Sequence, residues 1–455
     1  MSAVGTSGIA GKGSFARGVH PDGKKQLASE AAVEVLPTPE SVLIALQQHI
    51  GAPCEAVVKS RAEVAIGEIV GNAQAFVAAP VHASVDGTAG AVTATTLPNG
   101  RHVQAVPIAA AAEQSLIARA LWDDTYGGDW PTTGLDAHAP DQIVQAVRDA
   151  GLVGMGGAAF PTHVKLKSNP QRPLEALLVN GCECEPYLTA DYRLMVEAPE
   201  PIVTGALIAA RAAGAERVIV VIEDNKPRAV ERMRAAAGGT GIEVAAVRTQ
   251  YPMGGERQLI PAVMDMEVPT GALPLDVGVV VINVATAAAV ARAVVRKKPL
   301  THRIICVTGE GVVTPKNLLA PVGASYAELI ACCGGLAADA ARVISGGPMM
   351  GFALGDLDVP VTKGASGVVV LTAGQVRKAE ETACVRCGRC VDVCPLNLVP
   401  TRIALAARAS DWDLARRYHI TACCECGCCA YTCPASIPLV QLIRVGKATM
   451  PKAES

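Results

Sequence analysis

Two copies of one cysteine pattern near the carboxyl end constrain the fold of that region more than any other feature of the sequence. The first copy, CVRCGRCVDVCP, begins at Cys384, and the second, CCECGCCAYTCP, begins at Cys423. Both copies contain the spacing CxxCxxCxxxCP. Three closely spaced thiolates and a fourth before proline suit the corners of a [4Fe-4S] cube. The repeat therefore predicts a compact domain built around two clusters.

The order of the cysteines also predicts which thiolates share a cluster. In two-cluster ferredoxin folds, the fourth cysteine of each run binds the cluster of the other run. The expected ligand sets are therefore interlocked. They are Cys384, Cys387, Cys390 and Cys433 for one cluster, and Cys423, Cys426, Cys429 and Cys394 for the other.

The alternatives for these cysteines are structural zinc and disulfide bonds. Zinc sites favour paired CxxC units or mixtures of Cys and His rather than two runs of this kind. Ten of the 16 cysteines lie between residues 384 and 433, and the N-terminus lacks the apolar core of a secretory signal, so metal in a reducing cytosol is the better interpretation. Cys424 and Cys428 fit no ligand position, and we expect them to be small buried residues or to line a cluster cavity.

Length, charge and hydropathy restrict the class of protein further. A chain of 455 residues predicts several domains. Its net charge of -2 gives no electrostatic case for binding nucleic acid. The longest apolar stretch, residues 277–295, contains Asn283 and Arg292 and suits a buried strand followed by an Ala-rich helix. We therefore expect no transmembrane segment.

Changes in pattern along the chain predict a multidomain α/β protein with an additional β module. Residues 37–107 contain short β-branched runs broken by Gly and Pro and resemble the hybrid barrel of biotinyl and lipoyl carrier domains. No lysine occupies the turn around His82, so we expect a scaffold or docking role. The expected parts are a flexible Gly/Ser-rich tail at 1–14, a β barrel-sandwich hybrid module at 15–130, an α/β domain with a parallel sheet at 139–298, a compact α+β module at 299–374 and a mainly helical two-cluster domain at 375–446.

A glycine-rich loop lies within GLVGMGGAAFPTHVKL at residues 151–166. Gly154, Gly156 and Gly157 would allow backbone amides to approach a phosphate or a ring, and Lys165 would add a cation. A tight turn without a ligand is the alternative, because the pattern is not GxGxxG.

An acidic loop follows the next expected strand, in VNGCECEPYLTADYRLM at residues 179–195. Ligands of α/β sheets bind beyond the carboxyl ends of the strands, so Asn180, Glu183 and Glu185 would project into one crevice. The alternative is a polar loop with incidental charges. Cys182 and Cys184 have no His or Cys partners nearby in the sequence and are expected to pack rather than bind metal.

Taken together, these loops resemble the flavin site of the NADH-binding subunit of respiratory complex I, whose pattern is GRGGAGFPTG.KW followed by N.(D/E)E.EPG. VINVATAAAVARA is similar to the NNV.T stretch of that family, and YPMGGERQLI would face the nucleotide. The sequence departs from the family where Met155 replaces Arg, Ala159 replaces Gly and Cys182 replaces an acid. The resemblance implies catalytic roles for Glu183 and Glu185, and cofactor contacts for Gly154, Gly156, Gly157, Ala158, Phe160, Lys165, Asn180, Tyr251, Glu256, Asn283 and Thr286.

Over nearly its full length the chain resembles the RnfC family, a component of the Rnf (or Rsx) electron transport complex. The stretches that carry this resemblance include GVHPDGKK, APVHASVDG, GMGGAAFPTHVKL, NGCECEPYLTADYRLM, SGGPMMG and CCECGCCAYTCPASIPLVQLIR. The resemblance implies a Rossmann-like domain for FMN and NADH, and a soluble-ligand-binding β-grasp-like module at 299–374. It also implies electron transfer through two [4Fe-4S] clusters, other Rnf subunits as partners, including integral membrane subunits, and an indirect link to ferredoxin. The expected location is peripheral, on the cytoplasmic face of the bacterial inner membrane.

Two alternatives to this function are considered. The cobalamin reductase of propanediol microcompartments shares the flavin loops and two clusters, but it begins close to its glycine loop, whereas about 140 residues precede the loop here. The other alternative is an electron-carrying docking subunit without nucleotide chemistry of its own, which Met155 and Cys182 make conceivable.

Overall fold

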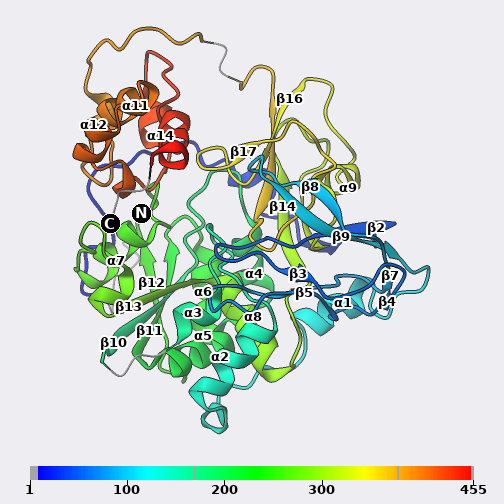
Figure 1. Cartoon of the computed structure of the whole chain (residues 1–455). Helices are drawn as coiled ribbons and strands as arrows, with labels where there is room; N and C mark the ends of the chain where they lie inside the picture. The colour runs from blue at the N-terminus through cyan, green and yellow to red at the C-terminus, as the bar shows by residue number, and fades with distance from the viewer. Residues whose placement is uncertain (1–8, 168–170, 377–378, 452–455) are drawn as a thin grey trace.

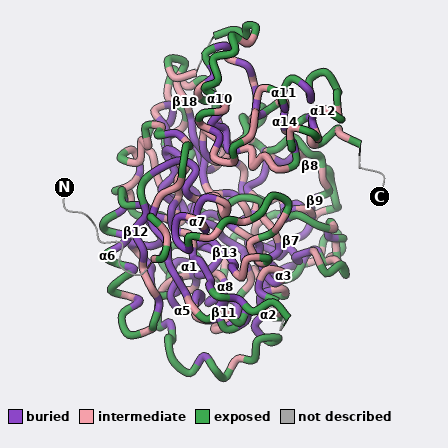
Figure 2. The backbone as a smooth tube through the Cα atoms, turned by 90° about the vertical axis from the view of Figure 1, so that its left-hand side faces the viewer, coloured by how far each residue is buried: buried purple, intermediate pink, exposed green. Residues whose placement is uncertain are grey.

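The computed structural model of this chain describes residues 9–167, 171–376 and 379–451. Layers of sheet and helix form the larger part of the molecule, and the C-terminal helices form a separate body above α7 (Figure 1). Buried residues follow the strands through the centre of the molecule, and exposed residues lie on its outer loops and helices (Figure 2). Within the described ranges, no helix combines the length and apolar character needed to cross a membrane.

A parallel sheet in the order β12-β11-β10-β13 forms the centre of the expected α/β domain. Its strands are rich in Val, Ile, Leu and Ala because helices cover both faces and leave little of either face to solvent. The strands are β10 (Leu174–Asn180), β11 (Ala215–Glu223), β12 (Glu243–Val247) and β13 (Val279–Asn283). The helical segments around them are η2 (Leu135–Ala137), α2 (Pro140–Asp149), α3 (Thr162–Leu166), α4 (Ala190–Glu197), α5 (Pro199–Ala213), α6 (Pro227–Ala236), α7 (Glu256–Met264), η3 (Pro274–Val277) and α8 (Val284–Val295).

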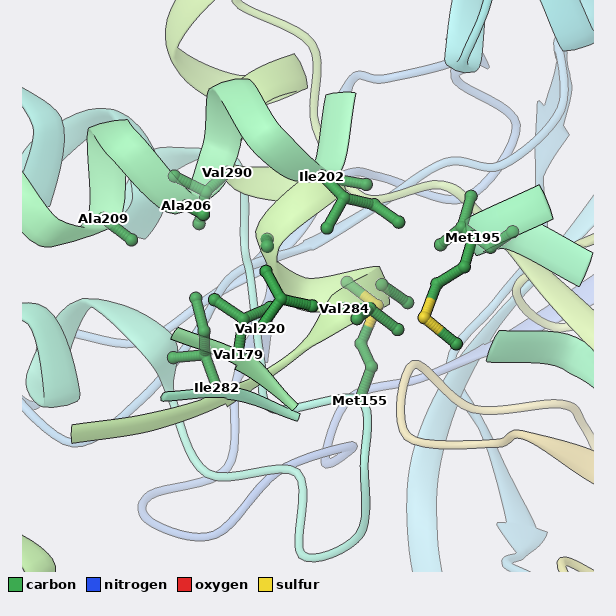
Figure 3. Close-up of a cluster of buried hydrophobic side chains, with 14 of the residues drawn as sticks. Met155, Val179, Met195, Ile202, Ala206, Ala209, Val220, Ile282, Val284 and Val290 are labelled. Carbon is green, nitrogen blue, oxygen red and sulfur yellow. The ribbon is translucent and has the colours of Figure 1, made fainter. Parts of the chain in front are cut away.

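Helices α5 and α8 pack very closely over one face of this sheet. A Cβ atom added to Gly205 in α5 would lie 1.7 Å from the backbone oxygen of Ala287 in α8. Figure 3 shows Ala206 and Ile202 of α5 above Val220 and Ile282 of the sheet. The small residues of α5 therefore allow the helix backbones to approach and bury the sheet beneath them.

The barrel module is formed by short antiparallel strands on the N-terminal side. One sheet has the order β2-β9-β7-β4, with β8 also paired to β9, and another has the order β3-β5-β6. Their buried faces form one apolar core that includes Ile44, Val70 and Ile108. The strands are β2 (Ser41–Ala45), β3 (Glu55–Ala56), β4 (Glu63–Val64), β5 (Ile69–Asn72), β6 (Val81–His82), β7 (Gly87–Ala89), β8 (Thr93–Thr96) and β9 (His102–Ala110). Helix α1 (Ala118–Thr125) follows, and its Leu121 and Trp122 join the core of the α/β domain instead.

The next module is a mixed sheet in the order β1-β15-β14-β18-β16-β17 with one helix packed on it. Its edge strand β1 comes from the N-terminal part of the chain and runs parallel to β15. Its elements are β1 (Val33–Val35), β14 (His302–Thr308), β15 (Lys316–Pro321), α9 (Tyr326–Cys332), β16 (Ala340–Ser345), β17 (Phe352–Ala353) and β18 (Gly367–Thr372).

Short helices make up the C-terminal body, as the sequence predicts. They enclose a small core that contains Ile403, Leu439 and Ile443 together with several of the cysteines. The helices are α10 (Arg389–Asp392), α11 (Pro400–Arg408), α12 (Trp412–Arg417), η4 (Ile420–Ala422), α13 (Cys428–Thr432) and α14 (Leu439–Thr449).

The first segment of the described chain differs from its expected role. We expected a flexible tail at residues 1–14, of which residues 1–8 lie outside the described chain. The N–H groups of Gly11 and Gly13 donate to the last-turn carbonyls of Val263 and Ala262 in α7, at 2.9 and 2.8 Å. These carbonyls have no partner within the helix, so the segment caps α7 and is docked. Residues 11–28, including η1 (Lys25–Leu27), run along the α/β domain rather than joining the barrel.

Candidate functional site

The carboxyl ends of β10 and β13 bring the acidic loop next to the start of α8. Asn180 and Asn283 are register partners in this parallel pair. The Asn283 side chain caps α8 by accepting from the Ala285 N–H at 2.8 Å. In open α/β sheets this edge is where ligands bind, and both asparagines lie there.

The glycine loop folds back onto the same edge. The Gly154 N–H donates to the Phe160 oxygen at 2.8 Å, and the Met155 N–H donates to Thr286 Oγ1 of α8 at 3.0 Å. A Cβ on Gly156 would come within 3.1 Å of the Asn283 Cβ. The loop, Asn283 and Thr286 are thus brought together.

The tip of the glycine loop is open to solvent. Gly156, Gly157 and Ala158 are exposed, while Met155 beside them is buried. A Cβ on Gly157 would meet nothing within 4 Å. Backbone with free space above it is what a flavin or its phosphate requires, so the residues present fit such a group.

Glu183 is bound to the N-terminus of α4. Its carboxylate accepts from the backbone N–H groups of Asp191 and Tyr192 at 2.7 and 3.2 Å. Burial raises the pKa of Glu183 to about 7, although Lys25 opposes the shift. The Asp191 carboxylate accepts from Asn283 Nδ2 at 2.6 Å, so it joins the acidic loop to α8. Sequence reasoning missed Asp191, although an acid in the first turn of an expected helix was a signal for it.

Lys25 fixes the backbone of the acidic loop through hydrogen bonds. Its Nζ donates to the backbone oxygens of Glu183, Glu185 and Leu188 at 2.7, 2.8 and 2.6 Å. Burial lowers the pKa of this ammonium, and the carboxylate of Glu183 opposes that shift. Sequence reasoning missed this residue too, because the contact joins segments about 160 positions apart.

Glu185 is held by the α+β module that begins after α8. Its carboxylate accepts from the N–H groups of Met349 and Met350 at 3.1 and 2.8 Å. A Cβ on Gly347 would lie 2.2 Å from Glu185 Oε2, so only glycine permits this approach. Burial raises the pKa of Glu185 to about 7, and these amides oppose the rise. The turn in SGGPMMG therefore fixes the position of the Glu185 carboxylate of the acidic loop.

Lys363 joins the barrel, the α/β domain and the α+β module beneath the glycine loop. Its buried Nζ donates to the backbone oxygens of Pro80 and Gly151 at 2.6 and 2.7 Å. Burial lowers its pKa to about 7. The neighbouring Gly364 approaches Ala159 of the glycine loop. The open tip of the loop thus lies where these modules meet.

The remaining residues expected near the nucleotide divide into two groups. Lys165 forms an ion pair with Glu256 at 2.6 Å and donates to the Val281 oxygen at 3.2 Å, so both side chains lie beside β13. Tyr251 instead faces the C-terminal body, and its hydroxyl donates to the Cys426 backbone oxygen at 2.6 Å. The Tyr251 hydroxyl is therefore bound to the second cysteine motif.

The two cysteine motifs have the same backbone conformation at equivalent positions. Gly388 and Gly427, 39 residues apart, have φ values of 81° and 85° and start the short helices α10 and α13. Two further pairs with positive φ occur at the same spacing, Arg386 with Glu425 and Asn397 with Ser436. The sequence repeat is therefore also a structural repeat.

A cavity in the C-terminal body is lined by the four cysteines expected to bind one cluster. They are Cys394, Cys423, Cys426 and Cys429. Cys394 comes from the first motif and the others from the second, which is the interlocked arrangement. Cys424 and Cys428 also line this cavity. These residues fit a cluster, and the lining matches one of the two roles considered for the extra cysteines.

Three members of the other expected ligand set lie in or against the same core. Cys390 and Cys433 are buried there and Cys384 packs against them, whereas Cys387 is exposed. In the described ranges, no three His, Cys, Asp or Glu side chains converge as closely as a single metal ion would require.

Family models match this chain along most of its length. A "Nuo51 FMN-binding domain" matches residues 147–292, and an "RnfC Barrel sandwich hybrid domain" matches residues 13–113. An "SLBB domain" matches residues 304–353, and a "4Fe-4S binding domain" matches residues 379–398. The expectations of a barrel-sandwich module, an FMN-binding domain and an iron-sulfur domain are confirmed. The chain is therefore a multidomain α/β protein with these parts.

Solved structures give weaker support, for the fold alone. One NAD+-reducing [NiFe]-hydrogenase chain, in the H2-reduced state, is 22% identical, with a TM-score of 0.50. The match covers 72% of this chain and 64% of that one.

Curated relatives match nearly the whole chain. The RnfC subunit of the proton-translocating ferredoxin:NAD+ oxidoreductase complex of Clostridium ljungdahlii is 40% identical, over 86% of this chain and 84% of the relative. The corresponding subunit of the Na+-translocating complex of Acetobacterium woodii is 40% identical, over 88% and 89%. That of the ion-translocating oxidoreductase complex of Rhodobacter capsulatus is 41% identical, over 96% and 83%. At this identity and coverage, the chain belongs to the RnfC family of subunits of ion-translocating ferredoxin:NAD+ oxidoreductase complexes.

Proposed function

We propose that this chain exchanges electrons with NADH through FMN and passes them through two [4Fe-4S] clusters to other subunits of an ion-translocating complex. The observation that carries the proposal is the pairing, in one molecule, of an open glycine loop with a cavity lined by four cysteines from both motifs. The names of the relatives support NAD+ and ferredoxin as the electron partners of the whole complex.

FMN would accept a hydride from NADH, and each cluster would carry electrons one at a time. The exposed backbone of Gly156, Gly157 and Ala158 would hold the flavin, with Gly154 and Phe160 closing the loop by their hydrogen bond. Asn283 and Thr286 would fix the position of this loop at the start of α8. Lys165 and Glu256 would present a paired cation and anion beside β13.

Glu183 and Glu185 would act on the nucleotide from the acidic loop, with Asn180 fixing its start through a bond to the Gly254 oxygen at 2.9 Å. Burial brings the pKa of both carboxyls to about 7, so each could take or release a proton near neutral pH. Their backbone partners hold both carboxyl groups still. The proposed catalytic roles therefore combine position with proton exchange.

The two clusters would stand at different depths. The second motif lies against the rest of the molecule, since a Cβ on Gly427 would be 2.6 Å from the Met349 oxygen. The first motif faces solvent at Cys387 and at Val385, which is 67% exposed. Cys423, Cys426, Cys429 and Cys394 would hold the cluster nearer the rest of the molecule, and Cys384, Cys387, Cys390 and Cys433 would hold the cluster nearer solvent.

The proposed partners are the other subunits of the complex, including integral membrane subunits, with ferredoxin reached indirectly. The proposed location is peripheral, on the cytoplasmic face of the bacterial inner membrane. For the domain roles, we propose docking by the barrel of the expected 15–130 module, whose strands lie between residues 41 and 110. We also propose flavin and nucleotide binding at 139–298, a β-grasp-like module at 299–374, and electron relay at 375–446.

A second candidate is an electron-carrying docking subunit without NADH chemistry. It is favoured by Met155 and Cys182, which are both buried and present no polar group to a nucleotide. Buried Arg303 of β14 donates to the Ala365 oxygen at 2.9 Å and contacts Met155, so its guanidinium is bound to protein groups.

Exchange of one glutamate tests the proposed function. Glu183→Gln removes a titrating carboxyl and keeps one of its two backbone hydrogen bonds, so flavin reduction by NADH should slow by about 10²-fold with the clusters intact. Glu175→Gln is the matched control, because Glu175 lies on the same strand β10 at its opposite end. Stopped-flow absorbance under anaerobic conditions gives the rates. Equal rates for Glu183→Gln and the control would remove Glu183 from the mechanism, and absence of flavin reduction in the unchanged chain would favour the docking subunit.

A further inference from the structure

Tyr251 connects the α/β domain to the second cysteine motif. It lies between β12 and α7 and is only 2% exposed. Its hydroxyl donates to the backbone oxygen of Cys426 at 2.6 Å. Cys426 lines the cluster cavity, so this hydrogen bond reaches the backbone of an expected cluster ligand from another domain.

The backbone of Tyr251 is fixed by the N-terminal segment. Val19 and Tyr251 exchange two hydrogen bonds, at 2.9 and 3.0 Å, in an isolated antiparallel bridge. Next to it, the Gly18 N–H donates to the Val393 oxygen at 3.1 Å, and Arg17 Nη1 donates to the Val391 oxygen at 2.8 Å. The same short segment therefore holds Tyr251 and the residues just before Cys394, which is the ligand that crosses to this cavity.

The surroundings of the phenol come from both sides of the domain boundary. Cys428 of the second motif packs with Tyr251 in one small buried cluster, and Cys184 of the acidic loop packs against that cluster. Cys184 in turn accepts from the Gly254 N–H at 3.3 Å, three residues beyond Tyr251.

We propose that Tyr251 is a positioning residue for electron transfer, which holds the Cys426 backbone and raises the reduction potential of the cluster at that cavity. This inference rests on the proposed function. The physical reason is that the O–H dipole offsets the negative end of the Cys426 carbonyl dipole. Loss of that donor leaves more negative potential near the cluster and disfavours the added electron.

Tyr251→Phe tests the proposal, because it removes the hydroxyl and keeps the ring. From the strength of an ordinary hydrogen bond, we expect the ratio of reduced to oxidised cluster at a fixed potential to fall roughly two- to tenfold. A tenfold fall corresponds to a shift of about 59 mV to more negative potential for one electron. Redox titration followed by electron paramagnetic resonance measures this ratio for each cluster, independently of turnover. Electron transfer from flavin to the clusters should slow as well.

Tyr326→Phe is the matched control. Tyr326 is also a buried tyrosine with a hydrogen-bonded hydroxyl, 2.6 Å from Ser345 Oγ, but it lies in the α+β module, away from the cavity. Its substitution should leave both cluster potentials unchanged.

Three results would overturn the inference. The first is equal potentials in the Tyr251→Phe and unchanged chains, both carrying clusters, and the second is an equal shift in Tyr326→Phe. The third is loss of iron from Tyr251→Phe, since a positioning residue tunes a cluster that still assembles. A wild-type chain without clusters would contradict the proposed function as well as this inference. The three results above contradict this inference alone, so the two failures can be distinguished.

Discussion

The α/β domain and the C-terminal body place their candidate site residues differently relative to their cores. In the α/β domain, the sheet and its helices bury Val, Ile, Leu and Ala, and the glycine and acidic loops lie beyond the strand ends. In the C-terminal body, Cys390, Cys429 and Cys433 are themselves members of the core. The first site is added to a core that is complete without it, whereas in the second the proposed ligands help to form the core. Cofactor loss should therefore affect the two regions unequally.

Removing the clusters should have the largest effect of the changes considered. It should destabilise the C-terminal body and leave the α/β domain folded. Without iron, the cysteines in this core are no longer joined through the clusters, so helices α10 to α14 should lose most of their protection from hydrogen exchange. Strands β10 to β13 should keep theirs, because their core contains no proposed ligand. Hydrogen exchange with mass spectrometry, before and after anaerobic chelation of iron, measures both regions in one sample. Equal loss of protection in both regions would contradict the contrast.

Single cysteine changes sharpen the comparison within the C-terminal body. Cys433→Ser should damage the cluster of the first motif and remove about half of the iron, because its thiolate crosses to that cluster. Cys424→Ala is the control and should retain both clusters. Iron and sulfide assays with electron paramagnetic resonance distinguish them. Damage confined to the cluster of the second motif in Cys433→Ser would show that the motifs are not interlocked.

Adding a side-chain atom where α5 and α8 touch should destabilise the α/β domain alone. In Gly205→Ala the new Cβ would meet the Ala287 oxygen, so α5 and α8 must separate, at a cost of about 1–3 kcal/mol or more. Gly355→Ala is the control, because a Cβ there meets nothing within 4 Å, and it should change stability by less than about 0.5 kcal/mol. Chemical denaturation followed by far-UV circular dichroism measures both, and iron content should not change. Equal stability of the two variants would contradict the close contact of α5 with α8.

The acidic loop should give a smaller, pH-dependent effect. The pKa of Glu185 rises from 4.5 to about 7 on folding, so the folded chain holds this proton more tightly than the unfolded chain does. The contribution of Glu185 to the unfolding free energy should therefore be fully present below pH 4.5 and should be lost as pH rises through about 7, by about 1–2 kcal/mol after allowance for partial exposure. Glu185→Gln should flatten this part of the pH profile, measured by denaturation at each pH. Glu175→Gln serves as the control, and parallel profiles for the wild type and Glu185→Gln would rule out the carboxyl as the cause.

The cysteine region could be anticipated from the sequence because its geometry is local. A spacing repeated at 39 residues produces the same positive φ at Gly388 and Gly427, and the crossing of Cys394 follows from the repeat. The glycine loop and the strand-end asparagines were predictable for a similar reason, since a parallel sheet brings its carboxyl ends together.

The parts that could not be predicted depend on contacts between distant segments. Lys25 and Lys363 each donate to backbone oxygens of other modules, and carbonyl oxygens leave no sequence signal. The docking of residues 11–28 along the α/β domain follows from pairing with α7 and Tyr251 rather than from local composition. The contact of the Tyr251 hydroxyl with Cys426 is of the same kind, because its place in YPMGGERQLI gives no signal of it.

One anaerobic preparation tests the central claim most directly. The purified full-length chain should contain about eight irons, about eight sulfides and one flavin per molecule. On addition of NADH, the absorbance of flavin and clusters should both bleach. Flavin and clusters that remain oxidised in the presence of excess NADH, or a preparation without bound FMN, would contradict the claim that this chain passes electrons from NADH through a flavin to two clusters.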